Sequence, residues 1–187
     1  MLKKSIFIGL AAGLLAVCPL VSGCAGEQQT GSVVESSSQK AVQGEKFPSF
    51  TARDLAGNEV TEAIFAHKKI TVINIWGTFC PPCLGEMPEL GALARELPGD
   101  AQLIGIVIDA DGEGQASVIA EAQSILRQAD ADFLNLVPSP SLDKYLQNVD
   151  AVPTTIFVDN SGHLIGEPVV GADVEGYRAA VKAYLHE

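Results

Sequence analysis

Two cysteines three positions apart, Cys80 and Cys83, are the residues with the most distinctive chemistry in this chain. Thiols at this spacing can bind a metal ion, hold a haem or close a disulfide. A zinc site needs two further ligands, and haem attachment needs a histidine directly after the second cysteine, where Leu84 stands. A purely structural disulfide across so short a loop would stabilise the fold little. The three histidines are scattered: His67, His163 and His186.

The sequence around the pair favours reversible thiol–disulfide exchange. The β-branched run 70–76 predicts a buried strand, and a helix is expected to begin at the cysteines, where free N–H groups stabilise a thiolate. Pro81 and Pro82 suit the first turn of that helix. Because prolines supply no N–H donors, Cys80 should be less acidic than in a strong oxidant of this kind.

The elements that position this pair alternate between strand and helix. A hairpin is predicted from 47–51 and 55–60, and further strands at 70–76, 103–108, 133–137, 154–158 and 163–165. Helices are predicted after Cys80, over 115–130, over 142–146 and after the capping residue Asp173. This order predicts an α/β fold with a central mixed sheet and helices on both faces.

The N-terminus has the layout of a secretory signal. Lys3 and Lys4 precede an apolar run over 6–17, and Val21-Ser22-Gly23-Cys24 resembles a bacterial lipobox. We therefore expect a lipoprotein signal peptide over 1–23, a lipidated Cys24 with a flexible linker over 24–46, and a folded domain over 47–187. The predicted location is extracytoplasmic, on the bacterial cell membrane. A plain signal peptide and an uncleaved short anchor are the alternatives.

The charge of the chain limits the classes of partner that it can bind. The formal net charge is -11, and the only charged residues in 1–23 are two lysines, so the rest is more acidic still. Such a body is repelled by nucleic acid and by anionic lipid headgroups. We expect a monomer that binds no nucleic acid and reaches a membrane only through its lipid.

Two stretches resemble the TlpA/ResA-like branch of the thioredoxin superfamily. One runs from Val72 to Leu90 and contains the Cys-Pro-Pro-Cys sequence; the other is Val152-Pro153-Thr154-Thr155-Ile156-Phe157-Val158-Asp159. The extra helix and strand predicted over 115–137 are similar to the insertion typical of that branch. The resemblance covers residue 47 to the C-terminus and implies a thioredoxin-like fold.

The resemblance assigns roles to single positions. It implies that Cys80 is the nucleophile, that Cys83 is the resolving cysteine, and that Val152 and Pro153 form a cis-proline loop that offers backbone groups to substrate. The base rate for cis X–Pro bonds would favour an ordinary trans proline.

The resemblance also concerns three further positions. Glu86 matches an acidic residue thought to tune thiol acidity, although an exposed helix glutamate is an equal alternative. Trp76 matches a substrate-flanking tryptophan, although a core tryptophan is as plausible. Asn74 stands where many thioredoxins carry a buried acid, which leaves Glu86 as the candidate proton acceptor for Cys83.

The resemblance implies a protein-disulfide reductase without a prosthetic group. Its substrates would be secreted or membrane-associated proteins, as in cytochrome c maturation or antioxidant repair. Its electrons would come from a membrane thiol carrier of the CcdA/DsbD type. The rivals are a thiol oxidase or isomerase and a non-enzymatic metal or haem chaperone; a peroxidase is less favoured.

Overall fold

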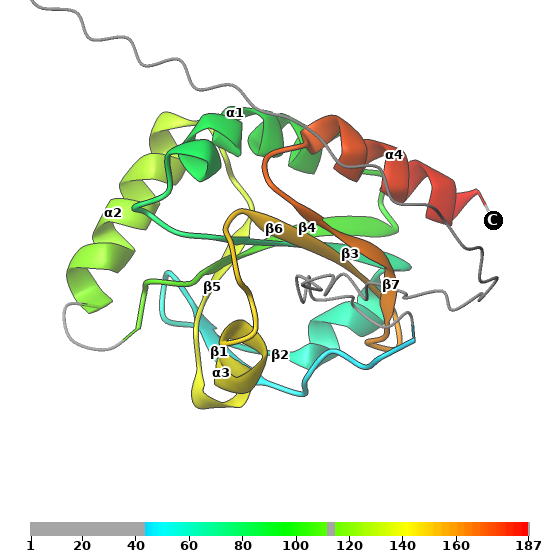
Figure 1. Cartoon of the computed structure of the whole chain (residues 1–187), viewed down its shortest axis with the longest axis horizontal. Coiled ribbons are helices and arrows are strands. Elements are labelled where there is room, and N and C mark those ends of the chain that lie inside the picture. The colour runs from blue at the N-terminus through cyan, green and yellow to red at the C-terminus, as the bar shows by residue number, and fades with distance from the viewer. Residues whose placement is uncertain (1–43, 112–114, 187) are drawn as a thin grey trace, which may run out of the picture. The chain divides into compact units, whose positions relative to one another are not determined.

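A computed structural model describes residues 44–111 and 115–186 of the chain (Figure 1). The predicted signal peptide, the lipidation site Cys24 and most of the predicted linker lie outside the described residues.

A seven-stranded mixed sheet forms the centre of the domain, in the order β2-β1-β5-β4-β3-β6-β7. The strands are β1 (Thr51–Asp54), β2 (Glu59–Thr61), β3 (Ile70–Trp76), β4 (Ala101–Val107), β5 (Leu134–Val137), β6 (Thr154–Asp159) and β7 (Leu164–Val170). β4 runs parallel to both β3 and β5, and β6 pairs antiparallel with β3 and β7. The predicted mixed sheet and thioredoxin-like fold are confirmed.

Helices cover both faces of this sheet. They are η1 (Glu62–His67, a 3-10 helix), α1 (Pro81–Glu96), α2 (Gln115–Gln128), α3 (Pro140–Leu146) and α4 (Val174–Leu185). Alternate side chains of β3 point to opposite faces. Val72 and Trp76 pack in one core cluster with α1, α2 and α4, and Ile73 and Ile75 pack in another with α3 and η1. β3 is buried along its whole length, as its apolar run predicts.

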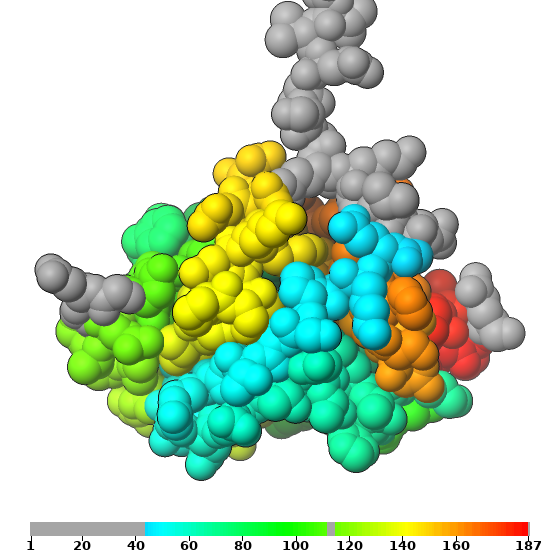
Figure 2. Space-filling view, turned by 90° about the horizontal axis from the view of Figure 1, so that it is seen from below, coloured from blue at the N-terminus to red at the C-terminus, as the bar shows by residue number. Residues whose placement is uncertain are grey.

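The N-terminal part of the domain differs from the prediction. A hairpin is present, with Gly57 at a φ of 90° in its turn, but its first strand is Thr51–Asp54 and not 47–51. Phe47 and Phe50 instead pack edge-on with each other and with Phe65 of η1. The three rings belong to one core cluster. Figure 2 shows α3 (yellow) beside the cyan segment that contains this hairpin.

Two further differences concern the edges of the domain. The 3-10 helix η1 was not predicted. Before Phe47, the Gly44 N–H donates to the Leu164 carbonyl and the Leu164 N–H to the Glu45 carbonyl. The chain therefore joins the fold three residues before the predicted start of the domain. None of the helices that the structure describes is both long and apolar enough to span a bilayer.

Candidate redox site

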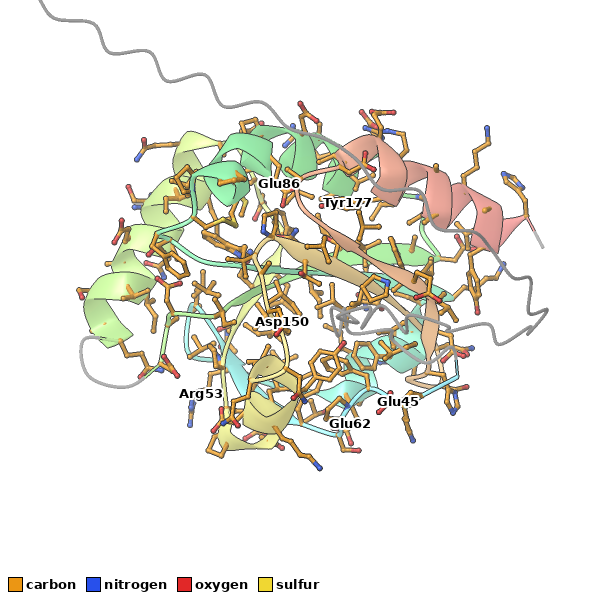
Figure 3. The ribbon with its side chains drawn as sticks, in the orientation of Figure 1. Glu45, Arg53, Glu62, Glu86, Asp150 and Tyr177 are labelled. Carbon is orange, nitrogen blue, oxygen red and sulfur yellow. A yellow bond between two sulfur atoms is a disulfide. The ribbon has the colours of Figure 1, made fainter. Side chains whose placement is uncertain are left out.

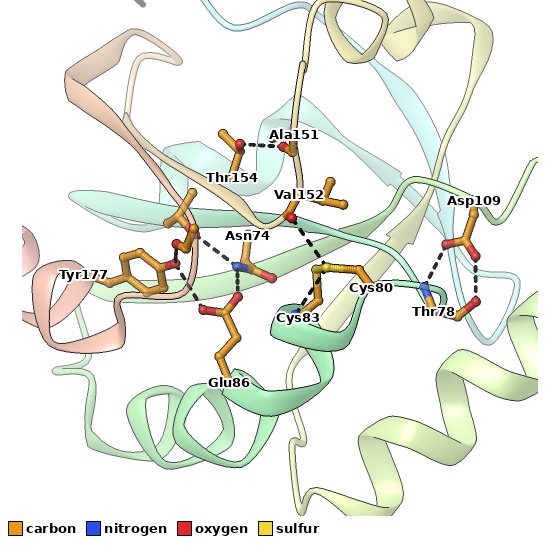
Figure 4. The surroundings of a disulfide bond; sticks show 12 residues. Asn74, Thr78, Cys80, Cys83, Glu86, Asp109, Ala151, Val152, Thr154 and Tyr177 are labelled. Atoms are coloured by element: carbon orange, nitrogen blue, oxygen red, sulfur yellow. Dashed lines mark hydrogen bonds between the residues drawn. A yellow bond between two sulfur atoms is a disulfide. The ribbon is translucent and has the colours of Figure 1, made fainter. Parts of the chain in front are cut away.

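Cys80 and Cys83 are joined in a disulfide at the beginning of α1, with their Cα atoms 5.3 Å apart (Figure 4). Cys80 is the N-cap of the helix, and its Sγ accepts a hydrogen bond from the Cys83 N–H at 3.3 Å. Pro81 and Pro82 occupy the first helical positions, where a missing N–H costs no intrahelical bond. Sequence and local structure therefore agree on a disulfide held at a helix N-terminus.

The loop before β6 faces the disulfide. The Val152–Pro153 peptide bond is cis, as the resemblance implies, and the Val152 carbonyl oxygen lies 3.4 Å from Cys80 Sγ. The Thr154 hydroxyl donates to the Ala151 carbonyl at 2.8 Å, and the Gly171 N–H donates to the Pro153 carbonyl at 2.8 Å. The loop is thus fixed from both sides, with a backbone acceptor next to Cys80 Sγ.

The turn that leads into Cys80 is held by Asp109, which the sequence analysis did not connect with the site. The Asp109 carboxylate accepts from the Thr78 N–H at 3.1 Å and from the Thr78 hydroxyl at 2.6 Å. Asp109 follows β4, and Thr78 follows β3. Because the carboxyl ends of parallel strands meet at one edge of a sheet, this proximity was available from the sequence.

Exposed apolar side chains gather near the disulfide. Phe79, directly before Cys80, is 66% exposed, and Leu84, in the first turn of α1, is 37% exposed. Val170 is 63% exposed and pairs with Thr154 next to the cis proline. Isolated apolar residues on a surface need no explanation, but three around a reactive centre are typical of a binding surface. None of these three side chains was predicted to belong to the site.

Trp76 does not belong to that surface. Its side chain is fully buried, and its Nε1–H donates to Asn135 Oδ1 at 2.9 Å. Gly105 makes room for this pair, since a Cβ there would clash with Asn135 Oδ1. The prediction that Trp76 contacts substrate is wrong, because no part of its ring reaches the surface. Trp76 is a core residue that supports the end of β3.

Glu86 is buried beneath the disulfide, on the same face of α1 as Cys83 and three residues further on (Figures 3 and 4). Its side chain is 3% exposed, so the alternative of an exposed helix glutamate is wrong. Oε1 accepts from Asn74 Nδ2 at 2.9 Å, and Oε2 accepts from the Tyr177 hydroxyl at 3.1 Å. Burial raises the pKa of Glu86, and these two hydrogen bonds partly oppose that rise.

The arrangement brings together the chemistry of disulfide exchange. A disulfide, a backbone acceptor beside Cys80 and a buried carboxyl one turn beyond Cys83 converge from β3, α1 and the loop before β6. A raised pKa suits a carboxyl to exchange protons near neutral pH. Across residues 44–111 and 115–186, no three or more His, Cys, Asp or Glu side chains are grouped to hold a metal ion.

Comparison with known proteins points to the same chemistry. A family model described as Redoxin matches residues 42–183. The chain is 27% identical over 143 residues to the thiol-disulfide oxidoreductase ResA of Bacillus cereus, which covers 74% of this chain and 78% of that protein.

Two solved structures share the fold. A secreted disulfide oxidoreductase of Mycobacterium tuberculosis, described as homologous to DsbE of E. coli, superposes with a TM-score of 0.57 and 25% identity over 72% of this chain and 95% of that one. A thiol:disulfide interchange protein of Chlorobium tepidum gives a TM-score of 0.62 and 19% identity over 77% and 98%.

Proposed function

Because this chain belongs to the Redoxin family and is a thiol-disulfide oxidoreductase of the ResA and DsbE type, we propose that it acts as an extracytoplasmic, membrane-anchored protein-disulfide reductase. The observation that carries the proposal is the Cys80–Cys83 disulfide at the N-terminus of α1, with the Val152 carbonyl 3.4 Å from Cys80 Sγ. No prosthetic group is required, because the two sulfurs carry both electrons.

The catalytic cycle begins with the reduced pair. The Cys80 thiolate attacks one sulfur of a substrate disulfide, so a mixed disulfide forms and one substrate thiolate leaves. Cys83 gives its proton to Glu86 and attacks Cys80 Sγ, which releases the second substrate sulfur as a thiolate and leaves Cys80–Cys83 oxidised; the substrate thiolates take up protons from water. Two electrons pass to the substrate, and an outside dithiol must restore them.

The surroundings of Cys80 suit a flexible protein segment as substrate. The Val152 carbonyl can accept a hydrogen bond from a substrate N–H, as a strand edge does. Phe79, Leu84 and Val170 are exposed and offer apolar contacts near the disulfide. An extended or incompletely folded segment can use both, because its backbone and its side chains are free.

We infer the direction of electron flow from what stabilises the Cys80 thiolate. The Cys83 N–H reaches Cys80 Sγ, but Pro81 and Pro82 contribute no N–H donor. Weak stabilisation of the thiolate favours a reductant, because strong oxidants of this type owe their potential to a stabilised reduced form. We expect a reduction potential of about -270 mV; a value of about -120 mV would indicate a thiol oxidase.

The location of the protein is proposed from its N-terminal sequence. Residues 1–23 would direct export, and the thiol of Cys24 would carry the lipid, with the following residues as a tether. A membrane dithiol carrier of the CcdA/DsbD type could then reach the site. Metabolic labelling with a fatty acid should mark the wild type and not Cys24→Ser, and an unlabelled wild type would refute the anchor.

The substrates can be identified with a trapping variant. Cys83→Ser should hold substrates as mixed disulfides on Cys80, and Cys80→Ser is the matched control that should hold none. Recovery of a small, reproducible set, such as an apocytochrome or a repair enzyme, would support a specific reductase. Random thiol proteins would contradict it. Tight binding of a metal ion by the reduced pair would favour a chaperone.

A further inference from the structure

The hydroxyl of Tyr177 lies between two hydrogen-bond acceptors. It is 3.1 Å from Glu86 Oε2 and 2.8 Å from the Gly171 carbonyl oxygen, and the side chain is fully buried (Figure 4). A phenol has one proton, so it can donate to only one of the two at a time. The choice between them depends on whether Glu86 carries a charge.

The phenol oxygen is fixed in this position by groups that donate to it. The Asp173 N–H approaches it at 3.2 Å, and the Thr155 side chain is a further hydrogen-bond partner. The second acceptor is fixed as well. Gly171 has a φ of 94°, which favours glycine, and its own N–H is bonded to the Pro153 carbonyl. Neither acceptor has to move for the proton to change partner.

We propose that Tyr177 is a positioning residue for Glu86. The hydroxyl proton of Tyr177 points to the Glu86 carboxylate when Glu86 is ionised, and to the Gly171 carbonyl when Glu86 is protonated. In the first state Tyr177 donates to Oε2. In the second the carboxylic acid donates to the phenol oxygen in place of the Thr155 hydroxyl, because that oxygen accepts at most two hydrogen bonds, so the direction of the Glu86 contact is reversed. This inference rests on the proposed role of Glu86 as proton acceptor for Cys83.

Only two side chains donate hydrogen bonds to the Glu86 carboxylate among the described residues, so the bond from Tyr177 contributes strongly to stabilising its charge. Asn74 donates from β3, Tyr177 donates from α4, and Glu89 on α1 is the charged neighbour, whose negative charge opposes ionisation. Asn74 Oδ1 has no hydrogen-bond partner among the described residues. Without Tyr177, a buried carboxylate would keep one donor, and hydrogen bonds to charged groups are among the stronger ones.

The test separates the two chemical steps in the full chain. Reduced protein is mixed with an aromatic disulfide that releases one coloured thiol when Cys80 attacks and a second when Cys83 resolves the mixed disulfide. The first phase depends on reagent concentration and the second does not. The variants are Tyr177→Phe and Glu86→Gln, with Tyr145→Phe as the control that removes a phenol from α3 on the opposite face of the sheet.

The proposal predicts an effect that depends on pH. In Tyr177→Phe the second phase should be about tenfold slower at low pH, its midpoint should move to higher pH, and the rate should recover fully above it. The first phase should match the wild type, as should both phases of Tyr145→Phe. A uniform slowing at every pH, or an unchanged profile, would overturn the role of Tyr177.

Two further results keep the proposals separate. If Glu86→Gln leaves the pH profile of the second phase unchanged, the acid–base role of Glu86 fails. If Glu86→Gln changes it and Tyr177→Phe does not, only the inference about Tyr177 fails. Should Tyr177→Phe not fold, infrared difference spectra of the wild type across the midpoint must show a tyrosine band that disappears in Glu86→Gln. Its absence would refute the exchange of hydrogen-bond partners.

Discussion

The two sulfurs of the disulfide lie in unlike surroundings, although only three positions separate them. Cys80 is 4% exposed, is approached by the backbone carbonyl of Val152 and follows the exposed ring of Phe79. Cys83 is completely buried, and the next residue on its face of α1 is Glu86, which is hydrogen-bonded below the surface. In the proposed cycle, Cys80 therefore attacks the substrate and Cys83 exchanges its proton with Glu86.

This difference has a physical reason. A thiolate that attacks a partner needs access, whereas a resolving thiol needs only to lose its proton while the partner is still attached. In the proposed cycle Glu86 is the base for Cys83, and its burial keeps it away from the charges that an incoming substrate brings. Cys80 lies at the N-terminus of α1, where it accepts the Cys83 N–H. Glu86, the proposed proton acceptor for Cys83, is held by side chains of β3 and α4.

The largest loss of activity is expected when either cysteine is replaced. Both Cys80→Ser and Cys83→Ser should lose essentially all catalytic turnover, since each step needs its own sulfur. The two should still differ in a single-turnover assay: Cys83→Ser forms a stable mixed disulfide and Cys80→Ser does not. If both variants trapped substrate equally, the division of roles would be wrong.

Replacing the buried Glu86 tests whether only the step at Cys83 depends on it. Glu86→Gln should slow the resolving step by about a hundredfold, because positioned general acid–base groups contribute at least that much. The initial attack by Cys80 should change little. Glu121→Gln, which removes an exposed carboxylate from α2, is the control. Equal slowing of both steps would indicate that Glu86 acts on the whole site.

Removing the exposed ring of Phe79 tests the binding of substrate near Cys80. Phe79→Ala should lower kcat/KM for protein substrates about tenfold, which corresponds to the loss of one partly buried aromatic contact. Small disulfides should react at the wild-type rate, because they do not reach that surface. A matching loss with small disulfides would mean that Phe79 shapes the turn around Cys80 and does not bind substrate.

The smallest predicted effect is on stability. Burial raises the pKa of Glu86 in the folded protein above its ordinary value, so the folded state holds this proton more tightly than the unfolded state. The free energy of unfolding should therefore decrease as pH rises from the ordinary carboxyl range through the raised pKa. Urea titrations of the oxidised protein should show this decrease, and Glu86→Gln should show less of it.

Local patterns predicted the central part of this fold. β3 was expected over 70–76 and occupies those residues, because a β-branched apolar run of that length suits a strand buried on both faces. The start of α1 followed from its prolines. The first hairpin strand was misplaced because aromatic residues such as Phe47 and Phe50 are common in strands, while the structure uses both as core rings before the strand begins.

The site was predicted less completely than the fold. The cysteine spacing and the residues around Pro153 are local signals, so the sequence reveals them. Glu86 and Tyr177 are 91 positions apart, and nothing local indicates that they meet. The burial of Trp76 has the same cause: whether a ring at a strand end faces substrate or core depends on Asn135, which comes from another strand.

The most direct test of the unequal sulfurs uses the unmodified protein. Wild-type enzyme reacting with a protein disulfide substrate is quenched with acid during turnover, and peptide mass spectrometry locates the sulfur that carries the substrate. The account predicts that the mixed disulfide is on Cys80. Substrate attached to Cys83, or divided equally between Cys80 and Cys83, would contradict it.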